Sequence, residues 1–301
     1  MILALSLVAC GPGHQASTSE TTGTGEPKAA STVIQNKGSD TMVNLAQAWA
    51  ENYGKAHPEV AVAVTGGGSG TGIAALENNT VDIANSSREI KTEEAEKIQK
   101  ASGRAPVTHT VAYDALAIYT HRDNPLQKIT KEQLAGIFGE GGTTEKWSDL
   151  GVQVPGCSDQ TIVRVSRQNN SGTYEYFREW TLGKGDFKLG SRDMQGSKDV
   201  VDAVATTPCA IGYSGMGYKT DGVRFVPVAP GPDAVGVLPS VAAVYDHSYP
   251  IARGLYMYTA GPGSSAAQAF ITWVRTDAGQ QVVDAGGFVP LPPAERAPTG
   301  G

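Results

Sequence analysis

Apolar residues in the first third of the chain follow two patterns, one with strand spacing and one with helix spacing. An apolar pair opens a short strand at 33–34, and apolar residues recurring at helical spacing predict a helix over 42–53. A buried strand over 60–64, a short helix ending at residue 76 and a strand over 81–84 follow. Repeated strand, polar turn and helix are typical of an open α/β sheet, whose ligands bind where the strands end.

The rest of the chain continues this pattern, and 301 residues allow a second domain. A β-rich stretch over 107–120 predicts a strand that crosses between two lobes, and we expect the return near Pro239. A capping box at 130–133 opens a helix that ends at Phe138. The predicted first lobe covers 32–114 and 239–292, and the predicted second lobe covers 115–238. Further expected elements are strands over 162–165, 210–213 and 223–228 and helices over 174–180, 197–205, 265–275 and 277–284.

Polar turns stand at the predicted ends of several strands, over 39–41, 66–72, 86–88 and 167–173. Their glycines let backbone N–H groups approach a ligand closely, and a helix that starts in such a turn directs free N–H groups at it. Ser39 or Asp40 is expected to cap the helix over 42–53. The planar fork of arginine suits bidentate contact with a phosphate. Together these turns predict an anion site.

Each turn alone is weak evidence, because a plain tight turn and a solvated arginine are the commoner interpretations. No lysine follows Gly72, so the glycine-rich turn is not a Walker A loop, and Thr71 stands where a nucleophile elbow needs glycine. A phosphatase would need a base or metal ligands beside Ser69 or Ser171, and neither serine has a neighbouring histidine or carboxylate cluster in the sequence. We therefore expect a binding protein with no catalytic residue, metal or cofactor.

Composition narrows the classes of partner further. Apolar residues make up 40% of the chain and charged residues 18%, which is ordinary for a globular protein. The formal net charge of −6 argues against a nucleic-acid surface, which needs a basic face. An anion would have to be captured by local donors and dipoles, since the overall charge does not attract it.

The N-terminus is an apolar run over 1–10 that ends in Cys10 and is too short to span a bilayer. Its last four residues resemble the lipobox of bacterial lipoproteins, in which the cysteine is acylated. The resemblance implies a signal-peptide end over 1–10, a lipid anchor at Cys10, and a location on the periplasmic or cell-surface side of a bacterial membrane. The Gly/Ser/Thr/Pro/Glu-rich stretch over 11–31 is typical of a flexible tether, and 293–301 of a short tail.

Cys157 and Cys209 are the remaining cysteines. An exported protein folds in an oxidising compartment, where two cysteines more often form a disulfide than stay free. We predict that they are bonded to each other, with two unrelated thiols as the alternative.

Longer motifs resemble one family over roughly residues 32–290. The chain is similar to the phosphate-binding lipoproteins that feed high-affinity phosphate ABC transporters, which are type II periplasmic binding proteins. The matching motifs, in family order, are Gly38–Met42, Gly66–Gly72, Val81–Arg88, Asn124–Leu126, Gln133–Phe138, Arg167–Thr173 and Tyr249–Arg253.

The resemblance implies a two-lobed α/β fold, each lobe a mixed sheet flanked by helices, with two crossing strands between the lobes. It also implies inorganic phosphate clamped between the lobes of a monomer and passed to permease subunits, with the membrane contacted only through the anchor. The implied phosphate-binding residues are Ser39, Asp40, Thr41, Gly68, Ser69, Ser87 and Arg88 from the first lobe and Arg167, Ser171, Gly172 and Thr173 from the second.

One position departs from the family pattern. Its best-known members carry an aspartate after the third strand that accepts the proton of hydrogen phosphate and rejects sulfate, and this sequence has Ser87 there. Asp40 and Asp114 are candidates to replace that aspartate. The alternatives of sulfate, molybdate or tungstate binding by the same fold therefore stay open.

Overall fold

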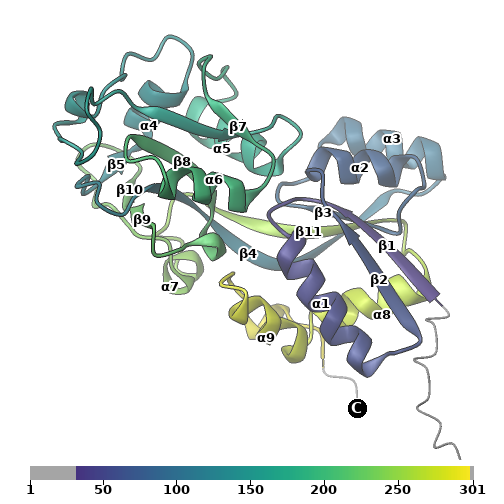
Figure 1. Cartoon of the computed structure of the whole chain (residues 1–301). Helices are drawn as coiled ribbons and strands as arrows, with labels where there is room; N and C mark the ends of the chain where they lie inside the picture. The colour runs from purple at the N-terminus through teal and green to yellow at the C-terminus, as the bar shows by residue number, and fades with distance from the viewer. Residues whose placement is uncertain (1–31, 299–301) are drawn as a thin grey trace, which may run out of the picture.

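The computed structural model describes residues 32–298, which fold into two lobes around one continuous sheet (Figure 1). The first lobe opens with β1 (Thr32–Gly38), β2 (Val60–Thr65) and β3 (Ile83–Ser86), paired in parallel with β1 in the centre. Helix α1 (Val43–Ala56) connects β1 to β2, and α2 (Ser69–Glu77) connects β2 to β3. The predicted strand, turn and helix repeat is thus confirmed here.

Two long strands complete the first lobe and join it to the second. β11 (Ala252–Ala260) lies antiparallel between β3 and β4 (Pro106–His121). The part of β4 up to Ala115 pairs with β11, whereas the part from Leu116 onward pairs with strands of the second lobe. Helices α1, α8 (Ser265–Val274) and α9 (Asp277–Ala285) cover one face of the first-lobe sheet, and α2 and α3 (Thr92–Ser102) cover the other.

The second lobe continues the sheet in the order β4-β8-β6-β7, and β9 also pairs with β4. A separate short pair of parallel strands, β5 with β10, lies in the same lobe. The bounds of the second-lobe elements are β5 (Ile129–Thr130), α4 (Lys131–Phe138), η1 (Trp147–Leu150), β6 (Val163–Arg167), α5 (Gly172–Leu182), β7 (Arg192–Met194), α6 (Ser197–Ala205), β8 (Ala210–Gly215), η2 (Met216–Tyr218), β9 (Val223–Val226), β10 (Val228–Ala229) and α7 (Val241–Tyr245). A further short helix, η3 (Pro293–Glu295), follows the first-lobe helices.

The return to the first lobe differs from the sequence expectation. Residues 241–251 pack into the core of the second lobe, where Tyr249 donates a hydrogen bond from its hydroxyl to the carbonyl oxygen of Leu116 at 2.8 Å. The chain therefore returns at the start of β11, and Pro239 only precedes α7, which Ser240 caps. Apolar side chains of α7 explain the difference, because Ala243 and Val244 are buried against the second lobe.

Two expectations about helix starts have opposite outcomes. The capping box of α4 is confirmed, since Thr130 and Gln133 exchange side-chain and backbone hydrogen bonds. The predicted cap of α1 is wrong: the helix starts one residue after Met42 with no side-chain cap. The Ser39 and Asp40 side chains are hydrogen-bonded to other turns instead.

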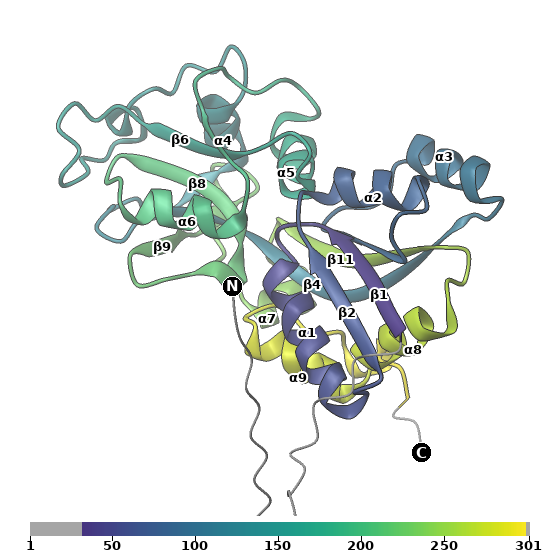
Figure 2. The same ribbon diagram turned by 45° about the vertical axis from the view of Figure 1, so that its right-hand side comes forward.

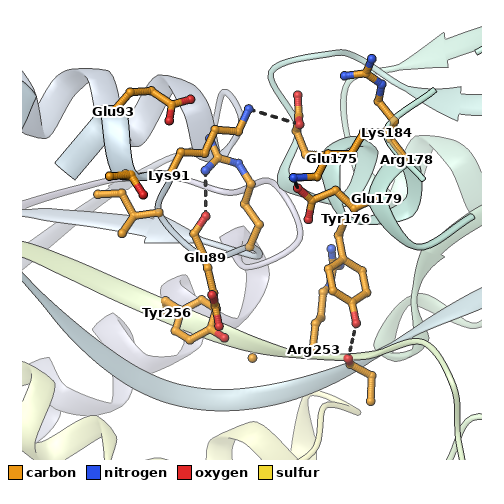
Figure 3. A pocket seen from close by; sticks show the side chains of 15 residues that line it. Glu89, Lys91, Glu93, Glu175, Tyr176, Arg178, Glu179, Lys184, Arg253 and Tyr256 are labelled. Atoms are coloured by element: carbon orange, nitrogen blue, oxygen red, sulfur yellow. Dashed lines mark hydrogen bonds and ion pairs between the residues drawn. The ribbon is translucent and has the colours of Figure 1, made fainter. Parts of the chain in front are cut away.

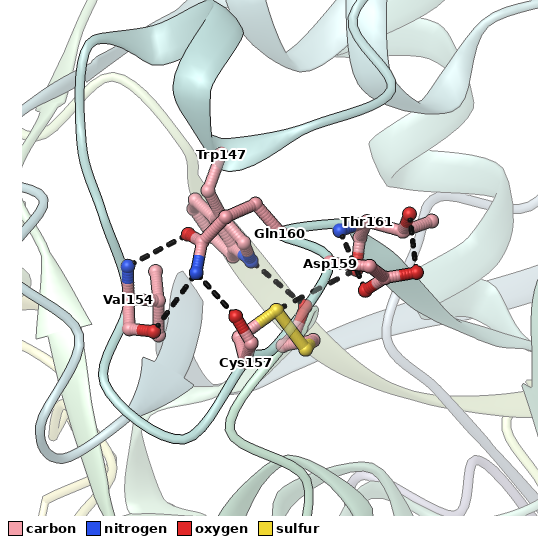
Figure 4. Close-up of a disulfide and its surroundings, with 7 residues drawn as sticks. Trp147, Val154, Cys157, Asp159, Gln160 and Thr161 are labelled. Carbon is pink, nitrogen blue, oxygen red and sulfur yellow. Dashed lines mark hydrogen bonds between the residues drawn. A yellow bond between two sulfur atoms is a disulfide. The ribbon is translucent and has the colours of Figure 1, made fainter.

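The predicted disulfide between Cys157 and Cys209 is confirmed, with their Cα atoms 5.1 Å apart (Figure 4). It ties the loop after η1 to the start of β8, and the Trp147 indole donates to the Cys209 carbonyl oxygen at 3.0 Å beside it. Asp159 lies close enough to both sulfur atoms to suggest a metal site, but these sulfurs are bonded to each other.

The expected anchor at Cys10, the tether over 11–31 and the last residues of the tail lie outside the described residues. Within residues 32–298, every helix is too short or too polar to cross a membrane.

Candidate anion-binding site

The predicted polar turns meet where the two lobes face each other. The first lobe contributes the turn after β1, the start of α2 and the turn after β3, which all lie at the carboxyl ends of parallel strands. The second lobe contributes the end of β6 and the starts of α5 and α6. Figure 2 shows α2 and α5 approaching each other across the gap between the lobes.

Buried hydroxyls form a continuous cluster at this meeting point. Within the first lobe, Ser39 Oγ donates to Ser87 Oγ at 2.9 Å, and Ser69 Oγ lies 3.4 Å from Ser87 Oγ. Between the lobes, Thr41 Oγ1 and Thr173 Oγ1 are 2.8 Å apart. All five side chains are buried.

Gly172 lies at a point of close approach between the lobes. A Cβ at this position would lie 2.4 Å from Ser69 Oγ and 2.7 Å from Ser87 Oγ, nearer than real Cβ contacts come. Gly68 is also close to the opposite lobe, since a Cβ there would lie 2.6 Å from the Asn170 carbonyl oxygen. In addition, its φ of 93° at the start of α2 belongs to the left-handed region that favours glycine. The sequence prediction named both glycines as ligand-contacting positions, and the structure places both in the interface.

Further contacts hold the lobes in a closed arrangement. The Gly70 N–H donates to the Asn170 carbonyl oxygen at 3.1 Å, and Asn170 Nδ2 donates to the Gly67 carbonyl oxygen at 2.9 Å. At the outer edge, Lys91 Nζ lies 3.3 Å from a Glu175 carboxylate oxygen. The hydroxyl cluster is therefore covered by both lobes.

Arg167 supplies a fully buried positive charge beside the hydroxyls. Its Nη1 donates to Ser197 Oγ at 3.0 Å, and its Nε and Nη2 donate to the Gln195 carbonyl oxygen. The nearest carboxylate is that of Asp40, whose Oδ2 lies 3.7 Å from Nη2. Burial lowers the pKa of Arg167, because the charged form loses solvation, and the negative charge of Asp40 opposes this effect. A site with this charge favours an anion.

Arg88, the second arginine of the sequence prediction, does not join the cluster. Its Nη1 and Nη2 donate to the two Glu94 carboxylate oxygens at 2.8 and 2.6 Å. Burial by itself would lower the pKa of Arg88, but the hydrogen bonds and charge of Glu94 raise it. This bidentate pair turns the guanidinium away from the hydroxyls.

The sequence prediction missed Ser197 and the role of Arg253. Ser197 Oγ lies between Arg167 Nη1 and Thr41 Oγ1, at 3.0 and 3.3 Å. Arg253 Nη2 donates to Thr173 Oγ1 at 3.0 Å and to Asp114 Oδ2 at 2.8 Å. The signal for Ser197 was its place at the start of a helix expected over 197–205. The position of Arg253 depends on the long-range pairing of β11 with β4.

A charged cavity of about 720 Å³ lies beside the cluster, between the lobes (Figure 3). The guanidinium of Arg253 stands 5.7 Å from the ring centre of Tyr176 on its wall, and the Lys91–Glu175 ion pair crosses it. The remaining charged residues that line it are Arg88, Glu89, Glu93, Arg178, Glu179 and Lys184. Cations and carboxylates alternate, so the cavity has no strong net charge.

Among residues 32–298, the site contains donors but no arrangement for nucleophilic catalysis. Within the described chain, Ser69 Oγ has the Ser87 hydroxyl and backbone N–H as its neighbours, and Ser171 Oγ accepts from the Thr173 N–H. Neither serine is paired with a histidine or carboxylate base, as an activated nucleophile would be. The arrangement can hold an anion through hydrogen bonds.

Comparison with known proteins gives consistent results. Residues 16–278 match the model of the PBP superfamily domain. The chain is 35% identical to the phosphate-binding protein PstS of Pseudomonas aeruginosa over 276 residues, which are 88% of this chain and 85% of the relative. It is 30% identical to the phosphate-binding protein PstS of Bacillus subtilis over 286 residues, with 94% and 89% covered.

Solved structures are similar as well. A phosphate ABC transporter substrate-binding protein from Clostridium perfringens, solved with bound phosphate, superposes with a TM-score of 0.75 at 26% identity, covering 86% of this chain and all of that one. An ABC-type phosphate transport receptor from Vibrio cholerae gives a TM-score of 0.68 at 25% identity with the same coverage. The expected two-lobed fold is thereby confirmed.

Proposed function

Since this chain belongs to the PBP superfamily and, within it, to the PstS family of phosphate-binding proteins, we propose that it binds inorganic phosphate between its lobes and delivers it to an ABC transporter for import. It is a binding protein, not an enzyme, and it acts outside the cytoplasm. The lipid anchor at Cys10 and a monomeric state are parts of this proposal. The arrangement at the lobe interface supports it.

One observation carries the proposal: a fully buried arginine lies beside a cluster of buried hydroxyls at the starts of several helices. Uncharged hydroxyls and backbone N–H groups can surround an anion without competing for its charge, while Arg167 offsets part of that charge. Hydrogen bonds to a charged group contribute about 1.5–3 kcal/mol each. The proposed contacts are the side chains of Ser39, Asp40, Thr41, Ser69, Ser87, Arg167, Ser171, Thr173 and Ser197, with backbone N–H groups near Gly68 and Gly172.

Arg88 was also expected to contact phosphate, and we now propose a different role for it. Its bidentate pair with Glu94 fixes the turn after β3 to the start of α3. That turn carries Ser87, so Arg88 holds a binding hydroxyl in place without touching the ligand.

The mechanism is closure of the two lobes around the anion. We propose a first lobe made of residues 32–114 with the chain from β11 onward, and a second lobe between them. Each lobe supplies part of the hydroxyl cluster, so the complete set of donors exists only when the lobes meet. Phosphate therefore stabilises the closed form, as expected for hinge closure around a ligand.

Calorimetric titration of phosphate into wild type and Arg167→Ala tests the proposal. Loss of two charge-assisted hydrogen bonds, at about 1.5–3 kcal/mol each, is expected to weaken phosphate binding by about 10²- to 10⁴-fold. Arg122→Ala removes an exposed arginine in a turn and is the matched control, with unchanged affinity expected.

Thr41→Val is a second test that does not depend on correct folding of the Arg167→Ala protein, because it removes one interlobe hydroxyl and no charge. Phosphate binding by a correctly melting Arg167→Ala protein at wild-type affinity would show that the site is misplaced. Wild-type protein that binds sulfate or molybdate but not phosphate would replace the ligand in this proposal with another oxyanion.

A further inference from the structure

A second buried arginine, Arg253, lies at the other end of the hydroxyl cluster from Arg167. Arg253 Nη2 donates to Thr173 Oγ1 at 3.0 Å, and Thr173 Oγ1 lies 2.8 Å from Thr41 Oγ1. Thr41 Oγ1 lies 3.3 Å from Ser197 Oγ, which accepts from Arg167 Nη1 at 3.0 Å. A chain of three hydroxyls from both lobes therefore connects the two guanidinium groups. Thr173 and Ser197 each accept from an arginine, so their own hydrogens remain free for a ligand.

The orientation of the Arg253 guanidinium is fixed by Asp114. The two residues lie opposite each other on β11 and β4, close to the point where β4 passes into the second lobe. Arg253 Nε and Nη2 both donate to Asp114 Oδ2, at 3.1 and 2.8 Å, and Asp114 Oδ1 accepts from the Met216 N–H at 3.2 Å. Both carboxylate oxygens are thus occupied, and the edge of the guanidinium formed by Nε and Nη2 faces the carboxylate.

The remaining N–H groups of Arg253 point away from Asp114. A guanidinium is planar, and its Nη1 and Nη2 present two parallel N–H groups at the end of the side chain. Nη2 uses its N–H at this end on Thr173, so the parallel N–H of Nη1 points to the space beside the Thr173 hydroxyl. Within residues 32–298, Nη1 is buried and no group accepts a hydrogen bond from it.

A buried Nη1 without a partner lowers stability, because it loses its hydrogen bonds to water. The Tyr176 ring centre lies 5.7 Å from the guanidinium carbon, near the limit of about 6 Å for a cation–π contact, so the ring compensates little of this loss. Burial lowers the pKa of Arg167, the charge of Asp40 opposes this, and the positive charge of Arg253 adds to the lowering. An anion between the two arginines would offset both effects, because one of its oxygens would accept from Nη1 and its charge would attract both guanidinium groups.

We propose that Arg253 is a second arginine of the anion site and donates a hydrogen bond from Nη1 to the bound oxyanion. This inference rests on the proposed function, since it assumes that the anion lies in the hydroxyl cluster. An anion oxygen within hydrogen-bond distance of the Thr173 hydroxyl also lies within reach of the parallel Nη1 donor. Asp114 acts through Arg253, because it fixes the guanidinium in this orientation and balances its charge. Each lobe thus supplies one guanidinium, Arg167 from the second lobe and Arg253 from β11.

The expected effect of removing this contact follows from the strength of one charge-assisted hydrogen bond, which accounts for about 10- to 100-fold in affinity. Arg253→Met removes the guanidinium and keeps most of the side-chain volume, but it leaves Asp114 without its partner. Arg253→Met combined with Asp114→Asn removes the ion pair as a whole, so that no unpaired buried charge remains. Both proteins are expected to bind phosphate about 10- to 100-fold more weakly than wild type.

The matched control is Arg224→Met. Arg224 on β9 is also partly buried, and its Nη1 donates to the carbonyl oxygens of Asn124 and Leu126 inside the second lobe. Calorimetric titration of inorganic phosphate should give wild-type affinity for this variant, because these contacts lie outside the hydroxyl cluster. Thermal melting of each protein without phosphate shows whether it is folded.

A crystal structure of wild type with bound phosphate tests the contact itself, which a purely structural role of Arg253 would not produce. The distance from Arg253 Nη1 to a phosphate oxygen is expected to be about 2.7–3.2 Å. An Nη1 that bonds only to water, with the nearest phosphate oxygen beyond about 3.5 Å, overturns the inference.

The outcomes separate the inference from the proposed function. A folded wild type that binds no phosphate overturns the proposed function. Phosphate binding that is lost in Arg167→Ala but stays within about threefold of wild type in both Arg253 variants overturns the role of Arg253 and leaves the function intact. An equal loss of affinity in Arg224→Met also overturns that role, since the effect would then not be specific to the contact.

Discussion

Substituting Gly172→Ala should abolish tight binding without harming the fold. In the closed structure a Cβ on residue 172 would lie 2.4 Å from Ser69 Oγ and 2.7 Å from Ser87 Oγ, whereas real Cβ contacts stay above 3.0 Å. Both oxygens belong to buried side chains on the opposite lobe. They are fixed by their own hydrogen bonds, so the added methyl group must keep the lobes apart.

The size of the effect follows from these distances. The lobes must separate by at least about 0.6 Å at this point for the contact to reach 3.0 Å. The interlobe contact between Thr41 and Thr173, now 2.8 Å, would then approach the limit of a hydrogen bond. If two charge-assisted bonds to the anion are lost at about 1.5–3 kcal/mol each, phosphate affinity falls by about 10²- to 10⁴-fold.

The open form should not be destabilised. Gly172 is the first residue of α5, and alanine is favoured over glycine in a helix by about 0.5–1 kcal/mol. The matched control is Gly54→Ala in α1, where a Cβ would have no heavy atom within 4 Å. Calorimetry, thermal melting and small-angle scattering with and without phosphate measure binding, stability and closure. A Gly172→Ala protein that binds phosphate within threefold of wild type and closes normally would refute the reasoning.

Two further predictions concern stability. Burial would raise the pKa of Glu94, but hydrogen bonds from Arg88 and from the Lys91 N–H lower it. The ionised Glu94 carboxylate therefore stabilises the fold fully above the ordinary glutamate pKa of 4.5. This stabilisation decreases as the pH falls through the lowered pKa. Glu94→Gln should therefore lower the free energy of unfolding by about 1–2 kcal/mol at pH 7, after allowing for solvent screening, and by less at pH 3. Urea unfolding at both pH values measures this, and an equal loss at both would contradict the prediction. Replacing Cys157 and Cys209 by serine should lower the free energy of unfolding by about 2–5 kcal/mol. Phosphate affinity should stay within threefold of wild type, because the disulfide lies away from the hydroxyl cluster. A large loss of phosphate affinity would contradict this prediction.

Much of the fold could be predicted from local patterns. Hydrophobic periodicity located most strands and helices, because each buries one face whose spacing is visible in the sequence. The position at which the chain returns to the first lobe could not be predicted from neighbouring residues alone. Proline at 239 is a turn signal, but the deciding contacts are those of Tyr249 with Leu116, more than a hundred residues away. The predicted cap of α1 was wrong for a related reason. Ser39 and Asp40 have hydrogen-bond partners in other turns, and these compete with capping of the helix.

Prediction from local sequence also has a limit at the site, where it does not give the contacts of individual side chains. Residue types and their turns identified nearly all the hydroxyls, but they did not predict that Arg88 pairs with Glu94 or that Arg253 contacts Thr173. Arg88 has Glu94 only six residues along the chain, a partner that the sequence displays and that satisfies its guanidinium locally. Arg253 arrives on β11 and reaches Thr173 only because that strand is inserted between β3 and β4. The direction in which a hydroxyl donates depends on such distant donors. The sequence therefore predicts an anion site at these turns, whereas the partner of each arginine depends on contacts that only the folded chain creates.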